Sequence, residues 1–299
     1  MSQLVFHPIY SQLNLPVKHR FPIEKYQGIY DELRRCGVPA QQFVEPQPVA
    51  IEALKQVYEP SYVDSITSGE LDAKAMRRIG FPWSQQLLQR TLTAVGGTLL
   101  CADLALQKGV ALNLTGGYHH AFANFGSGFC IFNDLYLAAL QMLQQPGIDK
   151  VLIFDCDVHQ GDGTAKLAQN QANVFTVSLH AEKNFPYRKQ HSDMDFPLPK
   201  GMSDDAYLEV VDEALHLAFS QFKPDAVIYD AGVDIHQDDD LGHLDISTHG
   251  VFKRDRLVKG YCEQAGVPVA AVIGGGYQRD IKALVQVHLQ LFRAFGVVQ

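Results

Sequence analysis

Four short apolar runs constrain the fold of this chain more than any other feature. Each is rich in β-branched residues and is bounded by polar or glycine-rich stretches, which is typical of buried strands in a parallel sheet. The runs lie at residues 151–154, 174–177, 226–229 and 267–273. Helical periodicity lies between and around them, at residues 89–107, 134–143, 204–222, 248–263 and 281–295. This alternation predicts an α/β fold with a doubly wound, mainly parallel sheet.

The chain shows no low-complexity linker, internal repeat or shift in composition that would mark a domain boundary. We therefore expect residues 1–299 to form a single domain. The first eighty or so residues are less regular, with prolines at positions 16, 22, 39, 46, 48 and 60. We expect them to form helices and loops at one edge of the sheet and to help build the mouth of a site.

Charge and cysteine content argue against several classes of function. The formal net charge of -8 disfavours binding to nucleic acids or anionic membranes. It suits a cationic substrate, but an acidic balance also serves solubility, and both interpretations stay open. No stretch resembles a signal peptide or is apolar enough to span a bilayer. A cytoplasmic protein is expected, because the cysteines form no disulfide-like pattern. They are Cys36, Cys101, Cys130, Cys156 and Cys262.

The run at residues 151–154 leads into Asp155, Asp157 and His159, which occupy alternate positions. On an extended chain alternate side chains share a face, and the carboxyl end of a strand is where open α/β sheets bind ligands. A lone aspartate here would be read as a turn or a helix cap. Two neighbouring carboxylates repel each other, however, and a divalent cation relieves that repulsion. Together with an imidazole they predict a site for Zn²⁺ or Fe²⁺.

A further carboxylate ligand is expected after the run at residues 226–229, in the segment YDAGVDIHQDDDLG. Asp234 is the best candidate, and Asp230 could instead be a structural group or support a ligand. The pattern alone does not separate the two. Asp238 to Asp240 are interpreted as a solvated acidic loop.

The adjacent pair His119 and His120 follows a Gly-Gly turn. A single histidine is most often a structural hydrogen-bonding group. Here Asp155 and Asp162 could each accept an imidazole N–H, which would orient the rings and raise their basicity. A metal with two anionic ligands acidifies its bound water less than a three-histidine site does, so a general base is needed, and this pair can supply it.

A glycine-rich turn precedes Tyr277 in the segment IGGGYQ, at the end of the run 267–273. Glycines let the backbone approach a site closely, and a tyrosine hydroxyl there could donate to a developing oxyanion. Taken alone, this segment also fits a turn followed by a core aromatic residue.

At these residues the sequence resembles the histone deacetylase superfamily, most closely its class IV branch and bacterial relatives. The resemblance covers roughly residues 90–290 and rests on GGYHHA, GSGFCIFND, DCDVHQGDGT, TVSLH, AGVDIHQDDDLGHLDIS with the following KRD, and GGGY, in that order. The earlier HRFPIEKY and GFPWS segments are similar to class IV chains but less diagnostic. It implies an arginase/deacetylase-type fold with zinc bound by Asp157, His159 and Asp234. It further implies proton transfer by His119 and His120, held by Asp155 and Asp162, and a Tyr277 that polarises the acyl carbonyl.

The resemblance also implies a substrate tunnel and a second cation. Phe129 and Phe185 would form facing walls of the tunnel, with Gly128 and Gly275 beside them. A monovalent cation such as K⁺ would bind Asp155, Asp157, His159, Ser178 and the backbone of Leu179. Gln160 departs from the better-known class I pattern, which has a second histidine there. The loop aspartate that grips the substrate backbone in class I members has no clear counterpart.

These observations together predict a zinc-dependent deacylase that hydrolyses an N-acyl amine, such as an acyl-lysine peptide, an acylated polyamine or a small metabolite. Metal-activated water would attack the carbonyl, with the histidine pair moving protons and Tyr277 stabilising the oxyanion. Two alternatives are a ureohydrolase-like enzyme with two metals and a catalytically silent protein that binds acyl-lysine or a metabolite. The histidine pair and Tyr277 favour the deacylase over the ureohydrolase.

Overall fold

A computed structural model describes residues 2–299 and contains one eight-stranded sheet in the order β2-β1-β3-β8-β7-β4-β5-β6. Every neighbouring pair of strands is parallel. The strands are β1 (Gln3–Val5), β2 (Phe43–Val44), β3 (Val110–Asn113), β4 (Val151–Asp155), β5 (Val174–Ala181), β6 (Met194–Leu198), β7 (Ala226–Asp230) and β8 (Val269–Val272).

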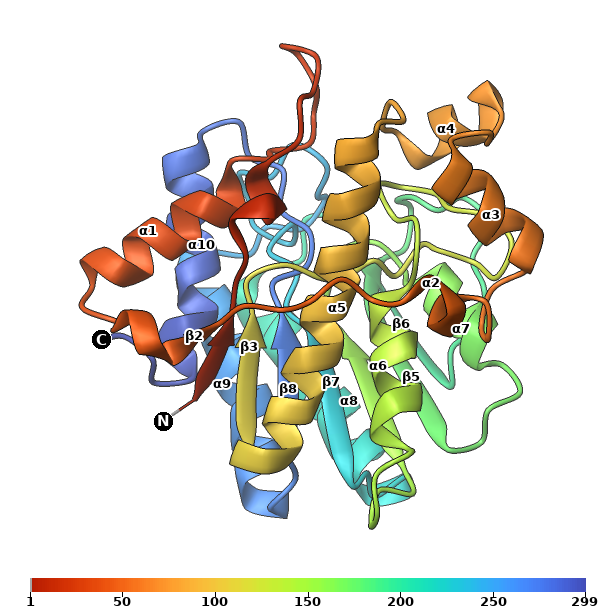
Figure 1. Ribbon diagram of the computed structural model, residues 1–299. Helices are drawn as coiled ribbons and strands as arrows, with labels where there is room; N and C mark the ends of the chain where they lie inside the picture. The colour runs from red at the N-terminus through yellow and green to blue at the C-terminus, as the bar shows by residue number, and fades with distance from the viewer. Residues whose placement is uncertain (1) are drawn as a thin grey trace.

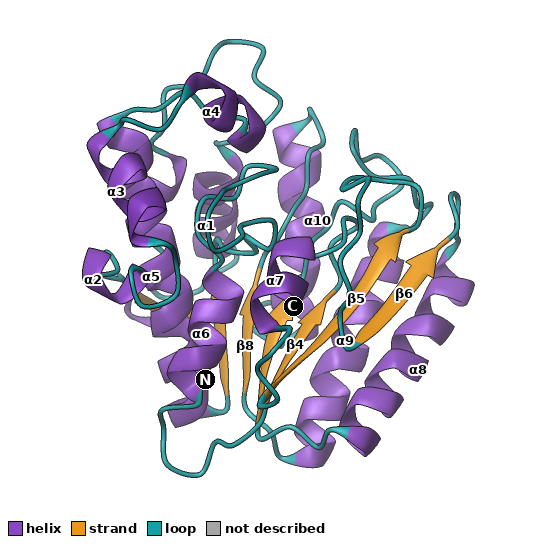
Figure 2. Ribbon diagram, turned by 90° about the vertical axis from the view of Figure 1, so that its right-hand side faces the viewer, coloured by secondary structure: helices purple, strands orange, loops and turns teal. Residues whose placement is uncertain are grey.

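Helices cover both faces of this sheet (Figures 1 and 2). One face carries α5, α6 and α7, and the other carries α8, α9 and α10, with α1 packed against α10. The predicted doubly wound α/β class is therefore confirmed. The helices are α1 (Lys25–Arg35), α2 (Ile51–Leu54), α3 (Pro60–Ser68), α4 (Ala73–Ile79), α5 (Gln85–Lys108), α6 (Asp134–Met142), α7 (Asp162–Ala168), α8 (Asp204–Gln221), α9 (Thr248–Ala265) and α10 (Ile281–Ala294), with short 3-10 turns η1 (Pro8–Ser11) and η2 (Ala40–Gln42).

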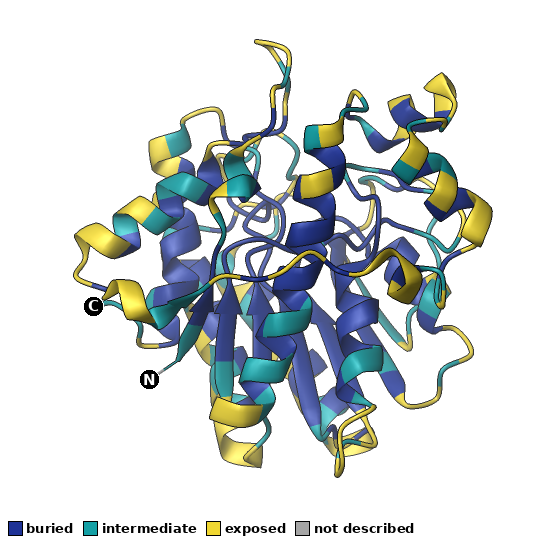
Figure 3. Ribbon diagram, in the orientation of Figure 1, coloured by how far each residue is buried: buried dark blue, intermediate teal, exposed yellow. Residues whose placement is uncertain are grey.

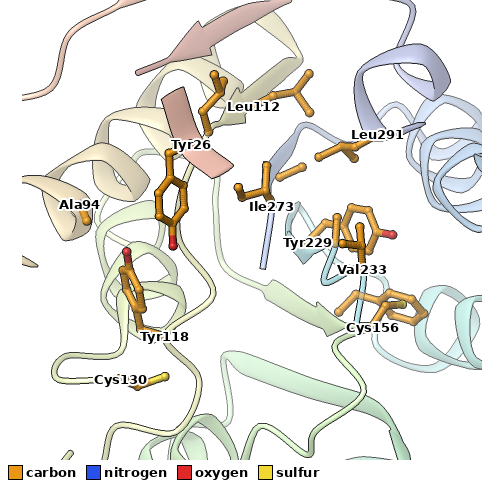
Figure 4. Close-up of a cluster of buried hydrophobic side chains, with 14 of the residues drawn as sticks. Tyr26, Ala94, Leu112, Tyr118, Cys130, Cys156, Tyr229, Val233, Ile273 and Leu291 are labelled. Carbon is orange, nitrogen blue, oxygen red and sulfur yellow. The ribbon is translucent and has the colours of Figure 1, made fainter. Parts of the chain in front are cut away.

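Two layers of apolar side chains hold the helices to the sheet. In β4, Leu152 and Phe154 belong to one buried cluster, while Val151 and Ile153 belong to the other. This division follows from the alternation of side chains along a strand. The central strands are accordingly buried throughout (Figure 3), and part of the larger cluster is drawn in Figure 4. Each fully buried Leu, Ile or Phe contributes roughly 1.5–3 kcal/mol to stability.

The four predicted strands are all present, with β5 longer than expected and β8 shorter. The expectation for the first eighty or so residues was incomplete, because β1 and β2 enter the sheet there beside the expected helices and loops. Strands of two or three residues are too short to show a periodicity of their own. β1 is held in the sheet by pairing with β3, and β2 by pairing with β1. The prediction also did not include β3 and β6.

The carboxyl ends of the strands place acidic and polar groups side by side. Asp155 pairs in register with Ser178 on β5 and with Asp230 on β7. The strand ends at Asp155, however, and Asp157 and His159 lie in the following loop. The argument from strand alternation therefore does not explain their common orientation. Loop hydrogen bonds do, as described next.

Candidate active site

Asp157, His159 and Asp234 converge above the ends of β4 and β7. One possible ligand atom from each lies within 4.8 Å of the others. His159 Nδ1 is 3.0 Å from Asp157 Oδ1 and 3.1 Å from Asp234 Oδ2. The loop is held because the Val158 N–H donates to Asp234 Oδ1 and the His159 N–H donates to Asp157 Oδ1. All three side chains are buried, so their charges must be balanced locally.

The electrostatics of this cluster favour a bound cation. Burial and the neighbouring Asp157 charge raise the pKa of Asp234 to about 7. Burial opposes protonation of His159, but hydrogen bonds to Asp157 and Asp234 outweigh it and raise its pKa to about 10. Two carboxylates and an imidazole directed at one point form a donor set that suits Zn²⁺ or Fe²⁺. The residues present therefore fit a divalent metal.

Gly275 makes this convergence possible. A Cβ atom there would lie 2.3 Å from Asp157 Oδ2 and 2.4 Å from Asp234 Oδ2, closer than van der Waals contact allows. Its backbone N–H instead donates to Asp157 Oδ2 at 3.0 Å. The resemblance placed Gly275 beside the substrate tunnel, whereas the structure places it beneath the acidic cluster and not among the residues that line the pocket.

Asp230 belongs to a different cluster, together with His119 and Asp155. It is fully buried, with Oδ1 accepting from the Gly232 N–H at 3.2 Å and Oδ2 without a hydrogen-bond partner. Burial and the neighbouring charge of Asp155 raise its pKa well above the usual range. The structure thus separates the two aspartates that the sequence pattern left equivalent.

The two adjacent imidazoles are each held by a carboxylate. His119 Nδ1 is 2.7 Å from Asp155 Oδ2, and His120 Nδ1 is 2.7 Å from Asp162 Oδ1. The remaining ring nitrogens face each other, with the two Nε2 atoms 3.1 Å apart. The partners expected from the sequence are the ones observed. Because a carboxylate engages each Nδ1 atom, proton exchange is left to the Nε2 atoms.

The two imidazoles differ in their electrostatic surroundings. Burial disfavours protonation of His119, but the charges of Asp155 and Asp157 outweigh it and raise its pKa. Burial and the charge of His119 lower the pKa of His120 to about 4. A protonated His119 donating to a neutral His120 satisfies the short Nε2–Nε2 contact. Such a pair can provide both an acid and a base.

An open pocket of about 330 Å³ leads to these groups. Phe129 and Phe185 line it as the resemblance implied, together with Gly128, and His120, His159 and Tyr277 lie at its inner end. The His120 and Phe185 rings meet edge to face, with centroids 4.8 Å apart. The other residues that line the pocket are Arg20, Arg78, Asn184 and Leu241, and the sequence analysis assigned none of them to the site.

Tyr277 is positioned by an aspartate that the sequence analysis had assigned to a solvated loop. The Asp239 carboxylate accepts three backbone hydrogen bonds, from the N–H of Tyr277 at 2.6 Å, of Leu241 at 2.9 Å and of Gly242 at 3.1 Å. The interpretation as a solvated residue was wrong for Asp239. Its three N–H donors come together only in the folded loop, so three consecutive aspartates in the sequence do not reveal them. Desolvation and the charge of Asp157 raise the pKa of the Tyr277 phenol, which keeps it protonated as a donor.

Lys25 is a second residue that no motif marked. It begins α1 and is buried, and its ammonium donates to the carbonyl oxygens of Gly274 and Gly276, at 3.1 and 3.4 Å. Burial lowers the pKa of Lys25 to about 8, against the opposing pull of Asp234 and Asp239. Lys25 therefore fixes the carbonyl groups of the glycine turn, while Asp239 fixes the backbone N–H of Tyr277, which follows the turn.

Replacing Lys25 by methionine is expected to lower kcat by about 10- to 100-fold, because a displaced turn would misplace the Tyr277 hydroxyl. KM should change less, and metal content, measured by mass spectrometry of the purified protein, should remain. Lys74→Met, at an exposed position on α4, is the matched control. An unchanged kcat in Lys25→Met would show that the turn keeps its shape without this lysine.

Several of the groups expected to bind a monovalent cation are neighbours in the structure. Asp155 and Ser178 are neighbours in the β4–β5 register, and Leu179 follows on β5. Ser178 Oγ contacts His180 Nδ1 at 3.0 Å. A K⁺ site at these groups stays a prediction.

The parallel sheet and the acidic and imidazole groups at its carboxyl edge define an α/β protein of the arginase and deacetylase type. A family model described as "Histone deacetylase domain" matches residues 19–292. The chain belongs to the histone deacetylase family. Among residues 2–299, no helix is long and apolar enough to cross a membrane.

Curated relatives and solved structures agree with this membership. The chain is 49% identical to an uncharacterized protein of Picosynechococcus sp., over 97% of each chain. It is 31% identical to histone deacetylase 2 of Arabidopsis thaliana, over 94% of this chain and 75% of the relative. It is 29% identical to acetoin utilization protein AcuC of Bacillus subtilis, over 92% and 77% respectively.

Two crystal structures share the fold. One is an HDAC homolog complexed with SAHA, with a TM-score of 0.83 and 22% identity over 98% of this chain and 84% of that chain. The other is an HDAC homolog from Aquifex aeolicus, with a TM-score of 0.84 and 22% identity over 99% and 84%. The chain therefore carries a deacetylase-family domain.

Proposed function

We propose that this protein is a metal-dependent deacylase that hydrolyses N-acyl amines. The observation that carries the proposal is the buried His119–His120 pair, which shares a pocket with the cluster of Asp157, His159 and Asp234. These last three residues would hold Zn²⁺, or Fe²⁺. A bound divalent ion would polarise the acyl carbonyl and acidify a water molecule.

The chain's own residues supply the remaining steps. Phe129 and Phe185 enclose the acyl-bearing side chain of the substrate, and the Tyr277 hydroxyl donates to the acyl oxygen as negative charge develops on it. His120 Nε2, once released from its contact with His119 Nε2, accepts a proton from the attacking water. A protonated imidazole of the pair then gives a proton to the departing nitrogen. The amide C–N bond breaks, one water is consumed, and the products are a carboxylate and an amine.

We further propose that residues 1–299 act as one catalytic domain, since β1 and β2 from the amino-terminal part share the sheet that carries the site. We also propose that the chain is related to the class IV branch. A cytoplasmic location is proposed as well, and it is supported by five free cysteines. In a ureohydrolase-like enzyme a second metal would have to occupy the cluster of His119, Asp155 and Asp230. The His119–Asp155 hydrogen bond at 2.7 Å disfavours that alternative.

The direct test offers protein loaded with Zn²⁺ or Fe²⁺ a panel of acetyl-, medium-chain and long-chain acyl-lysine peptides, acetylated polyamines and guanidino compounds. We expect release of carboxylate from at least one acyl amine, loss of activity on chelation, and no urea from guanidino compounds. Urea release would favour the ureohydrolase. Binding of acyl-lysine without turnover would favour the catalytically silent protein.

Tyr277→Phe is expected to lower kcat by roughly 10²–10³-fold, the scale for loss of one oxyanion donor. Substrate affinity should change less, because the hydroxyl interacts most strongly with charge that develops only in the transition state. Metal content and the thermal unfolding midpoint should stay near wild type, since the ring is retained. Tyr187→Phe, at an exposed tyrosine, is the control. A variant with lower stability but normal activity per folded molecule would remove the phenol from the mechanism.

A further inference from the structure

Two arginines lie at the mouth of the pocket that leads to the proposed catalytic groups. Arg20 and Arg78 both line this pocket, and both are exposed. No aspartate or glutamate appears among the residues that line it. Within residues 2–299, neither guanidinium has a carboxylate within ion-pairing distance. The rim therefore offers two uncompensated positive charges.

Backbone and side-chain contacts join the segments that carry these arginines. His19, next to Arg20, places its Nε2 atom 2.8 Å from the carbonyl oxygen of Gly80. The Arg78 carbonyl accepts from the Gly128 N–H at 3.2 Å, and the Arg78 guanidinium lies 4.5 Å from the centroid of the Phe125 ring. Arg20 belongs to the red segment that projects on the same side of the sheet as α4 (Figure 1). These contacts tie the segment that carries Arg20 to the segment that carries Arg78, so the two arginines are held at one pocket mouth.

Glu24 and Asp240 line a neighbouring cavity together with Arg20, but neither forms an ion pair with its guanidinium. Asp239 accepts three backbone N–H groups, and Asp240 pairs with Arg279 at 2.6 Å. Asp238 is largely exposed, lies 3.8 Å from His236, and does not line the pocket. Although the whole chain has a formal net charge of -8, the charge at the mouth of this pocket is positive.

We propose that the preferred substrate carries a carboxylate at the end that remains at the pocket mouth when the acylated nitrogen reaches the catalytic groups, and that Arg20 and Arg78 bind this carboxylate at the rim. This inference rests on the proposed deacylase function and names its substrate class. Guanidinium groups match carboxylates in geometry as well as in charge. The same charges repel polyamines, so the cationic substrate that the overall acidic balance suits is disfavoured at the site. The carboxylate belongs either to a small acylated amino acid or to an acidic side chain flanking an acyl-lysine in a peptide.

The test compares substrates that differ only in this charge. One pair is 6-acetamidohexanoate and its neutral amide, and the other is an acetyl-lysine peptide flanked by glutamate and the same peptide flanked by glutamine. At low ionic strength we expect the charged member of at least one pair to have a kcat/KM roughly 3- to 30-fold higher, the scale for two exposed ion pairs. Which pair responds identifies the source of the carboxylate.

The ratio of kcat/KM for the charged substrate to kcat/KM for its neutral partner should fall to about one in an Arg20→Ala, Arg78→Ala double variant. In an Arg20→Glu, Arg78→Glu double variant this ratio should fall below one. Each preference is read as the ratio of two kcat/KM values measured on the same variant, so a general loss of activity in a variant cancels from it. Arg77→Ala, an exposed neighbour on α4 that does not line the pocket, should keep the full preference. Added salt should weaken the preference in wild type and leave the double alanine variant unaffected.

Binding separates this inference from the proposed function. In Tyr277→Phe, Kd values for fluorescently labelled forms of the two peptides, and competition by the two small compounds, report recognition without turnover. Tighter binding of the charged member, lost in the double alanine variant, supports the inference even if wild type hydrolyses nothing. Equal Kd values and equal kcat/KM values within both pairs would overturn it and leave the deacylase proposal intact.

Discussion

Asp234→Ala is expected to lose bound metal and hydrolytic activity together, whereas Asp230→Asn is expected to keep the metal. Asp234 Oδ2 is directed at the same point as Asp157 and His159, and its other oxygen accepts the Val158 N–H. Removing a support group around a metal site typically costs 10–100-fold in affinity or activity, so loss of a direct ligand should cost more than about 100-fold. Metal content by inductively coupled plasma mass spectrometry and turnover on the same samples measure both effects.

The contrast with Asp230 follows from its different surroundings. Asp230 has no contact with His159, and its raised pKa favours the neutral acid, which asparagine resembles in size and charge. Circular dichroism and the thermal unfolding midpoint should show that both variants are folded. An Asp234→Ala protein with full metal content, beside an Asp230→Asn protein without metal, would transfer the ligand role to Asp230.

His120→Ala is expected to lower kcat by about 10²–10⁴-fold, the usual contribution of a general acid–base group, and to retain metal. His120 lines the pocket and has a lowered pKa, so it meets the substrate as a neutral base. His119→Ala should also lower kcat, but less, because His119 does not line the pocket and acts through its contact with His120. Steady-state kinetics of both variants at matched metal content measure the difference.

His216→Ala, at an exposed histidine on α8, is the control for a general effect of removing an imidazole. Equal losses in the two pair variants would contradict the unequal roles. Losses of only a few-fold in both would remove the pair from proton transfer, and the proposed mechanism would then lack its base.

The central fold was predictable because buried parallel strands and amphipathic helices impose local patterns. The apolar runs around Ile153 and Ile228 are read correctly as strands, since a strand covered on both faces must be apolar at nearly every position. Two other strands carry no such pattern. β1, with three residues, and β6, which contains Pro197, depend on neighbouring strands for their conformation.

The candidate site was predictable where its residues sit within motifs, and not where they act through folding. Asp157 and His159 are two positions apart in the sequence, so their proximity is local. Lys25 and Arg20 reach the site from a segment more than 200 residues away from Tyr277. Their segment, HRFPIEKY, resembles class IV chains, but the resemblance assigns neither residue a role. Asp239 looked solvated because its three N–H donors are supplied only by the closed loop.

The sequence by itself determined the fold class, the order of the catalytic motifs and the chemical types of the groups at the site, because each depends on periodicity or spacing within a short segment. Only the tertiary structure shows that Asp234, the candidate favoured from the sequence, joins Asp157 and His159 while Asp230 does not, and that Arg20 and Arg78 lie at the pocket mouth. Both outcomes depend on how separate strands and loops approach one another. The path of a loop decides which cluster a carboxylate enters, and burial then shifts the pKa of that carboxylate. Neither the cluster of an aspartate nor the charges at the pocket mouth could therefore be read from residue order alone.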